Sequence, residues 1–143
     1  MVTYSFQRIF VLSALTVLAI DQFLKYVVLL STPSLTFSFL SFHLVQNTGA
    51  GFGLLKDYTP GLAIISLLVA LAVIYYYPQL PKEKLPQFFW GLFLGGVLGN
   101  LLDRILRGYV IDFIDVGFWP AFNVADAAIT VAMAGLVIYY WKE

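Results

Sequence analysis

The chain has 143 residues, of which 61% are hydrophobic and 11% are charged, and its mean hydropathy is +0.88. Soluble domains are about 45–50% apolar and about 25% charged, so this composition predicts an integral membrane protein. A net charge of zero without a basic run argues against nucleic-acid binding. The chain has no cysteine and one histidine, which excludes thiol chemistry and paired-histidine zinc motifs; we expect no metal and no cofactor.

Four apolar segments are predicted to cross the membrane as helices, at about residues 9–30, 61–77, 88–106 and 122–140. The first segment could pass for a signal peptide. However, no small-x-small cleavage site follows it and the apolar run continues past Asp21, so we interpret it as a retained helix. The predicted fold is an all-α membrane protein forming one domain over residues 1–143, with residues 31–58 and 107–121 outside the spans.

Asp21 and Lys25 lie four residues apart, on one face of the first predicted helix near its end. They could form an interfacial ion pair in which Lys25 extends its ammonium group toward water. Alternatively, Asp21 could lie at the rim of a functional site on that side of the membrane.

The segment 31–58 is the longest non-helical part of the chain. Residues 36–45 mix aromatic, β-branched and hydroxyl side chains in partial alternation, which predicts one or two strands. The following sequence, Asn47 to Gly53, has glycine at alternate positions but lacks the Lys-Ser/Thr of a phosphate loop. Its glycines would instead let the backbone approach an extended chain closely. We interpret His43 as a loop or interfacial residue.

Small residues recur every four positions along the third span, in a pattern that favours close helix packing. One ridge contains Gly91, Gly95, Gly99 and Asp103, and the neighbouring ridge contains Gly96, Asn100 and Arg104. The polar end of this helix should therefore face protein and not lipid. Asp103 and Arg104 could also form a structural charge pair.

Four of the eight acidic residues, Asp103, Asp112, Asp115 and Asp126, fall close together in the chain. A carboxylate in or near hydrocarbon is costly, so such residues are functional candidates. Two neighbouring carboxylates share a proton, because both cannot stay ionised, and together they can provide acid and base for hydrolysis. Asp112 and Asp126 come from separate segments and could meet as such a pair, but the residues alone equally allow Asp103 or Asp115 as a member. Asn123 and Asp126 also fit a simple helix cap with an acidic residue in the first turn.

Four spans place both termini on one side of the membrane and the candidate site on the other. The basic residues are divided equally between the two sides, with Arg8, Lys82, Lys84 and Lys142 on the terminal side and Lys25, Lys56, Arg104 and Arg107 opposite. If Lys25 and Arg104 belong to a site, the positive-inside rule gives weak support for cytoplasmic termini.

Four motifs in this order resemble bacterial lipoprotein signal peptidase (signal peptidase II). They are Asp21-x-x-x-Lys25; Asn47-Thr48-Gly49-Ala50-Gly51-Phe52; Gly95-Gly96-x-x-Gly99-Asn100-x-x-Asp103-Arg104-x-x-x-Gly108-x-Val110-x-Asp112-Phe113; and Phe122-Asn123-x-Ala125-Asp126. Each motif alone is weak, but together they are specific and cover most of the chain.

The resemblance implies an aspartic endopeptidase of the bacterial inner membrane that cleaves diacylglyceryl-modified prolipoproteins before the lipidated lipobox cysteine. It implies Asp112 and Asp126 as the catalytic pair. Asn47, Gly49, Asn100, Arg104 and Asn123 match positions that line the family's pocket, and Ala125 belongs to the last motif. Asp21, Lys25 and Asp103 are expected to have support roles. The family also implies a small extracytoplasmic β-cradle with a mobile loop, contact with membrane lipids, and inhibition by cyclic peptides of the globomycin type.

This chain departs from the family pattern in two places: Gly51 stands where alanine is frequent, and the connector between Asp112 and Asp126 is short. Two other functions remain as alternatives. A small four-helix proton-coupled transporter would use membrane-embedded carboxylates to carry protons. A non-enzymatic assembly factor would use its aspartates only for ion pairs with Lys25, Arg104 and Arg107.

Overall fold

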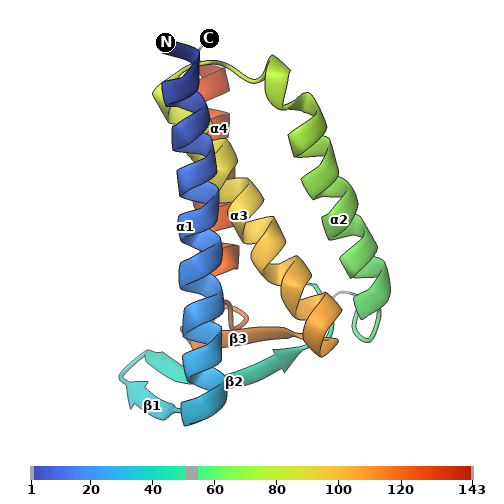
Figure 1. Ribbon diagram of the computed structural model, residues 1–143. Coiled ribbons are helices and arrows are strands. Elements are labelled where there is room, and N and C mark those ends of the chain that lie inside the picture. The colour runs from blue at the N-terminus through green and yellow to red at the C-terminus, as the bar shows by residue number, and fades with distance from the viewer. Residues whose placement is uncertain (1, 51–54, 143) are drawn as a thin grey trace.

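The computed structural model describes residues 2–50 and 55–142, and within them four helices are long and apolar enough to cross a membrane. These are α1 (Val2–Ser31), α2 (Thr59–Tyr76), α3 (Lys84–Arg107) and α4 (Val124–Trp141). A short 3-10 turn, η2 (Tyr77–Gln79), follows α2. Both chain ends lie at one end of the bundle, and a small sheet lies across the opposite end (Figure 1). The predicted membrane fold with four helices is confirmed.

Two helices begin earlier in the chain than the predicted spans. α1 already begins at Val2, because residues 2–8 contain no glycine or proline that would stop it. α2 begins at Thr59 with Pro60 in its first turn, where a missing N–H costs no helical hydrogen bond.

The connector before α3 is more structured than its sequence indicates. The predicted third span began at about residue 88, but α3 begins at Lys84. Gln87 is fully buried: its side-chain amide donates to the Pro81 carbonyl oxygen (2.8 Å) and accepts from the Tyr77 hydroxyl (3.1 Å). Hydropathy alone does not reveal these contacts, because they depend on the chain folding back on itself.

The two small-residue ridges of α3 face two different helices. A Cβ at Gly95 would lie 2.5 Å from the Ala14 carbonyl oxygen on α1, and one at Gly96 would lie 2.5 Å from the Ala125 carbonyl oxygen on α4. Real side chains do not approach this closely, so glycine is what permits both helices to contact α3. α1, α3 and α4 thus form the tight part of the bundle, while α2 packs against α3 and leans outward (Figure 1).

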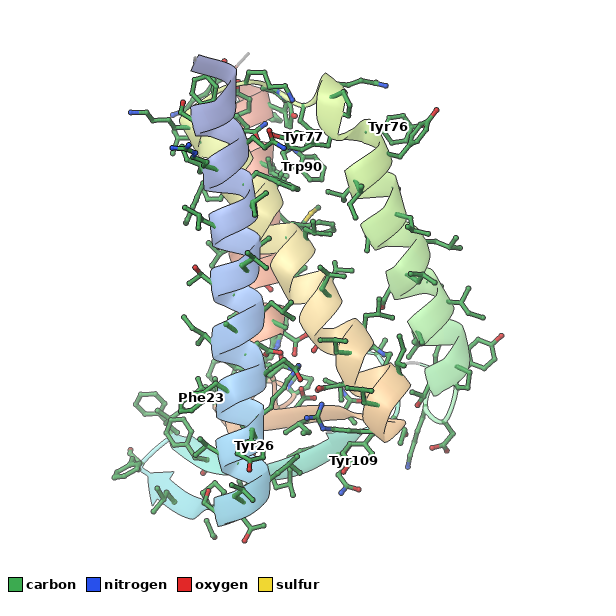
Figure 2. All side chains as sticks on the ribbon, in the orientation of Figure 1. Phe23, Tyr26, Tyr76, Tyr77, Trp90 and Tyr109 are labelled. Carbon is green, nitrogen blue, oxygen red and sulfur yellow. The ribbon has the colours of Figure 1, made fainter. Side chains whose placement is uncertain are left out.

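Aromatic side chains lie near both ends of the bundle. Tyr76, Tyr77 and Trp90 lie toward the end that holds the termini, whereas Phe23, Tyr26 and Tyr109 lie near the sheet (Figure 2). Aromatic residues favour the two membrane–water interfaces. Their distribution agrees with a bundle that crosses the bilayer along its length.

The sheet is antiparallel, in the order β1 (Ser34–Phe37), β2 (Leu40–Asn47) and β3 (Val110–Asp115). α3 ends at Arg107, and the next residue, Gly108, has a φ of +77° that turns the chain sharply into β3. In the β2–β3 register, Asn47 pairs with Val110 and Val45 pairs with Asp112. This register places Asp112 beside the end of β2, under the bundle.

Candidate active site

Asp112 and Asp126 reach the same cavity from different elements. Asp112 lies in the middle of β3 and is 1% exposed, while Asp126 lies in the first turn of α4. Both line a cavity of about 210 Å³ at the end of the bundle that carries the sheet. The described residues around it include Asn47, Gly49, Ala50, Asn100, Arg104, Val110, Trp119, Pro120, Ala121, Phe122, Ile129 and Thr130.

Asn123 contacts both carboxyl groups. Its side-chain oxygen accepts from the backbone N–H of Asp126 (2.9 Å), and Oδ2 of Asp126 accepts from the backbone N–H of Asn123 (3.2 Å), which together form a capping box. Its side-chain nitrogen donates to Oδ1 of Asp112 (2.8 Å). The cap predicted as an alternative to a functional role is therefore present, but the same residue also binds the second aspartate.

Two further amides orient the carboxyl groups. Asn47 donates from Nδ2 to Oδ2 of Asp112 (2.9 Å), and Asn100 donates from Nδ2 to Oδ1 of Asp126 (2.7 Å). Each aspartate thus accepts one hydrogen bond at each carboxyl oxygen. Three asparagines from β2, α3 and the start of α4 hold the pair in place.

The pKa of the Asp112 carboxyl is raised from 3.8 to about 7. Burial is the main cause, because it penalises the charged form, and the negative charge of Asp126 raises the pKa further. The hydrogen bonds from Asn47 and Asn123 and the positive charge of Lys25 act in the opposite direction. With this pKa, the protonated and ionised forms of Asp112 are both populated near neutral pH. A group that exchanges a proton in this range is suited to acid–base chemistry.

Arg104 lies at the cavity wall and does not pair with Asp103. Its guanidinium donates to the Gly49 carbonyl oxygen (3.5 Å) and to the Ser66 hydroxyl (3.4 Å), which connects α3 to the β2–α2 loop and to α2. Asp103 pairs instead with Lys25 and Arg107. The predicted Asp103–Arg104 charge pair is wrong, because consecutive residues of a helix point in different directions.

Asp21 and Lys25 form the predicted ion pair, with 2.8 Å between Nζ and Oδ2, but neither side chain is exposed. Lys25 does not extend toward water; it contacts Asp103 (2.9 Å) and Asn100 (3.1 Å) inside the bundle. The interpretation of Lys25 as an interfacial side chain is therefore wrong. Its polar partners on α3 make burial of the ammonium group possible.

Asp115 does not join the other two carboxylates. It is about one-third exposed, accepts from the backbone N–H of Gly117 (2.8 Å), and lies 3.7 Å from the His43 side chain. Asp103 is buried, but its oxygens are occupied by basic side chains and by the backbone N–H of Ile111. Of the open alternatives, only Asp112 and Asp126 line the cavity. Gly51, Phe52 and Gly53 of the predicted binding loop lie outside the described residues.

Over the described ranges 2–50 and 55–142, no group of three or more histidine or acidic side chains is arranged to hold a metal ion. Among the described residues, the polar side chains that line the cavity carry two carboxyls, two amides, one guanidinium, one hydroxyl and one indole N–H. This set can bind an extended peptide backbone and transfer protons.

Residues 13–142 match the family described as Signal peptidase (SPase) II. The chain belongs to this family. A lipoprotein signal peptidase of Moorella thermoacetica is 43% identical over 139 residues, covering 93% of this chain and 91% of that one. One from Thermodesulfovibrio yellowstonii is 39% identical over 140 residues, covering 92% of each.

Two solved structures share the fold of this signal peptidase II chain. Two structures described as a bacterial membrane enzyme superpose with TM-scores of 0.86 and 0.84, each at 29% sequence identity. They cover 93% and 94% of this chain, and 87% and 93% of their own chains. The resemblance predicted from the four motifs is confirmed, and the protein is a bacterial multi-pass membrane protein of a peptidase family.

Sequence reasoning missed Gln22, which contacts the buried charges of this signal peptidase II chain, and it named Arg107 only as an ion-pair partner in the assembly-factor alternative. Gln22 donates from Nε2 to both Asp21 (3.2 Å) and Asp103 (3.1 Å), and Arg107 pairs with Asp103 at 2.6 Å. The four-residue spacing from Asp103 to Arg107 is a helical ion-pair signal that indicates which aspartate Arg107 contacts. Gln22 has no such signal, because its role depends on how α1 meets α3.

Proposed function

We propose that this protein is an aspartic endopeptidase in which Asp112 and Asp126 are the catalytic pair. The observation that carries the proposal is that two carboxyl groups from separate elements line one cavity and share Asn123 as a hydrogen-bond partner. Like charges at such a site favour a state in which the pair holds one proton. The raised pKa of Asp112 supports this state near neutral pH.

In the proposed reaction, the ionised carboxylate takes a proton from a water molecule, whose oxygen attacks the carbonyl carbon of the scissile peptide bond. The protonated carboxyl gives its proton to the carbonyl oxygen, which forms a tetrahedral diol. When the diol collapses, one of its hydroxyls gives its proton to the ionised carboxylate, the C–N bond breaks, and the amine leaves with the proton of the other carboxyl group. One water is consumed, and the pair returns to its singly protonated state.

The proposed substrate is a diacylglyceryl-modified prolipoprotein, cleaved immediately before the lipidated cysteine. The names of the relatives support this substrate class. An apolar hollow of about 310 Å³ beside Asp126, bounded by Trp119, Phe122 and Val131, also suits a substrate that carries hydrocarbon. The peptide backbone of the substrate would contact Arg104, Asn47 and Asn100, which line the cavity. By family, cyclic peptides of the globomycin type would compete for this cavity.

We place the protein in the bacterial inner membrane with cytoplasmic termini, so that the cavity is near the extracytoplasmic face, in contact with membrane lipids. The position of the cavity at the sheet end, opposite the termini, supports a site at one interface (Figure 1). A transporter would instead need carboxylates near the bilayer midplane.

The test is cleavage of a purified diacylglyceryl-modified prolipoprotein by wild type, Asp112→Asn and Asp126→Asn in detergent. Each asparagine variant should keep its thermal transition and lose at least about 1,000-fold in kcat, in line with the loss of acid–base catalysis. Asp115→Asn is the matched control: it makes the same change on the same strand, outside the cavity, and should retain wild-type turnover.

Either aspartate variant cleaving at near-wild-type rate would remove that residue from the catalytic pair. A wild-type protein that never cleaves the substrate, although folded, would refute the peptidase and favour proton-coupled transport. Mass spectrometry of the products checks the position of cleavage: a new N-terminus other than the lipidated cysteine would contradict the proposed specificity.

A further inference from the structure

Behind the cavity, one ammonium group connects two buried carboxylates. Lys25, Asp21 and Asp103 are all 0% exposed. Nζ of Lys25 lies 2.8 Å from Oδ2 of Asp21, 2.9 Å from Oδ2 of Asp103 and 3.1 Å from Oδ1 of Asn100. An ammonium group has three N–H donors, and these three contacts use all of them. Lys25 is thus fixed from α1 to two points on α3.

The same two carboxylates each hold one backbone N–H next to a catalytic aspartate. Oδ1 of Asp21 accepts from the backbone N–H of Ala125 (2.9 Å), the residue before Asp126. Oδ2 of Asp103 accepts from the backbone N–H of Ile111 (3.0 Å), the residue before Asp112. The residue before each catalytic aspartate therefore donates its backbone N–H to a carboxylate that also contacts Lys25.

A third connection runs through Asn100. Its side-chain oxygen accepts from both Lys25 (3.1 Å) and Asn123 (3.0 Å). This arrangement directs the NH₂ group of Asn100 away from Lys25 and onto Oδ1 of Asp126, at 2.7 Å. The ammonium group thus also selects which end of the Asn100 amide faces the catalytic carboxyl.

We propose that Lys25 is a positioning residue that sets the separation and orientation of Asp112 and Asp126, by clamping Asp21 and Asp103 against the backbone at Ala125 and Ile111. The proposal rests on the proposed function, since it takes these two aspartates as catalytic. Small displacements of catalytic groups, of about 1 Å, can lower the rate about 100-fold. We call the contacts of Lys25 with Asp21 and Asp103, and of these carboxylates with the backbone N–H groups of Ala125 and Ile111, the clamp. The clamp prevents α4 and β3 from moving apart.

The charges of the clamp residues and of Arg107, which pairs with Asp103, sum to zero. Asp21 and Asp103 carry two negative charges, and Lys25 and Arg107 carry two positive charges. Removing Lys25 alone would leave a buried carboxylate without compensation, which is strongly destabilising. A useful variant must therefore remove one charge of each sign.

The main test is the double variant Lys25→Met/Asp21→Asn, measured with saturating and limiting diacylglyceryl-modified prolipoprotein. Asparagine keeps an oxygen that can accept from Ala125, so the fold should survive, as judged by size-exclusion elution and thermal transition. We expect kcat to fall about 100-fold while KM stays within about 3-fold. Gln87→Leu is the matched control: it removes buried hydrogen bonds at the far end of α3, and should lower thermal stability without changing kcat.

The pH profile separates positioning from simple structural support. The charged groups that face Asp112 are Asp126 from α4, Lys25 from α1 and Arg104 from α3. Because the charge of Lys25 lowers the pKa of Asp112, its removal should move the high-pH limb of kcat to higher pH. Gln87→Leu should leave that limb in place. A folded double variant with wild-type kcat and an unchanged profile would overturn the proposal.

Amide hydrogen exchange tests the clamp in the wild-type protein, whether or not the double variant folds. Val124 and Ala125 both lie in the first turn of α4, where backbone N–H groups have no acceptor within the helix. The N–H groups of Ala125 and Ile111 should exchange at least about 100-fold more slowly than that of Val124, because Asp21 and Asp103 hold them. Exchange at the rate of Val124 would refute the clamp.

The outcomes distinguish this inference from the proposed function. If Asp112→Asn and Asp126→Asn keep full activity, the proposed function fails, whatever the exchange rates. If both are inactive while the folded double variant turns over at the wild-type rate, the catalytic pair stands and the role of Lys25 is refuted.

Discussion

The side-chain amide of Asn123 donates a 2.8 Å hydrogen bond to Asp112, so the residue that caps α4 also holds the carboxyl group on β3. Serine caps a helix about as well as asparagine but has no NH₂ group. In Asn123→Ser we expect a thermal transition close to that of wild type and kcat at least about 10-fold lower. The loss of a bond that lowers the pKa of Asp112 should also move the high-pH limb upward. Asn123→Ser with unchanged kcat and pH profile would show that the residue is only a cap.

The raised pKa of Asp112 predicts how stability depends on pH. The carboxyl has a pKa of about 7 in the folded protein and an ordinary value of 3.8, so the folded state binds the proton more tightly. Its contribution to stability is fully present below about pH 3.8 and is lost as pH rises through 7. Between those values the loss is at most about 1.4 kcal/mol per pH unit. Thermal unfolding in detergent at pH 5 and pH 8 should show a lower transition at pH 8, and a smaller difference in Asp112→Asn.

The loss of the Asp112 proton should also limit kcat at high pH. If the pair must hold one proton, kcat should fall above about pH 7, because Asp112 loses its proton there. The measurement is the kcat profile of the wild type from pH 5 to pH 9 with lipidated substrate. Activity that continues to rise to pH 9 would contradict a protonated partner in the pair.

Gly96 lets α4 approach α3 beside the site. In Gly96→Ala, the new Cβ would meet the Ala125 carbonyl oxygen at 2.5 Å, which forces the start of α4, and Asp126 with it, to shift. We expect about a 100-fold loss of kcat. Gly91→Ala is the matched control, since its Cβ would meet the Phe10 carbonyl oxygen at 2.5 Å at the far end of the same helix. Equal losses of kcat in the two folded variants would mean that packing in general, and not the position of Asp126, sets the rate.

Arg104 presents a planar guanidinium at the cavity wall. Lysine keeps the charge but cannot contact Gly49 and Ser66 together with the same fork geometry. Arg104→Lys should therefore raise KM about 10-fold or more with a smaller change in kcat, measured by initial rates over a range of substrate concentrations. Arg8→Lys, on α1 near the N-terminus, is the control and should behave like wild type. A wild-type KM in Arg104→Lys would exclude a substrate-binding role.

The sequence by itself determined the four spans, the two glycine ridges of α3, and the small set of acidic residues that were candidates for the site. These features depend on local properties: apolar length, four-residue spacing along a helix, and the cost of a carboxylate near lipid. They are the same whatever the chain packs against.

Tertiary structure alone decided which charges meet. Asp112 and Asp115 lie three apart on one strand, so they point to opposite faces, but only packing of β3 beneath the bundle determines that Asp112 points inward. Likewise, helical spacing pairs Asp21 with Lys25 but says nothing about Asp103 on α3. Hydrogen bonds between distant segments need both partners in place, and their geometry follows from how α1, α3, α4 and the sheet pack together.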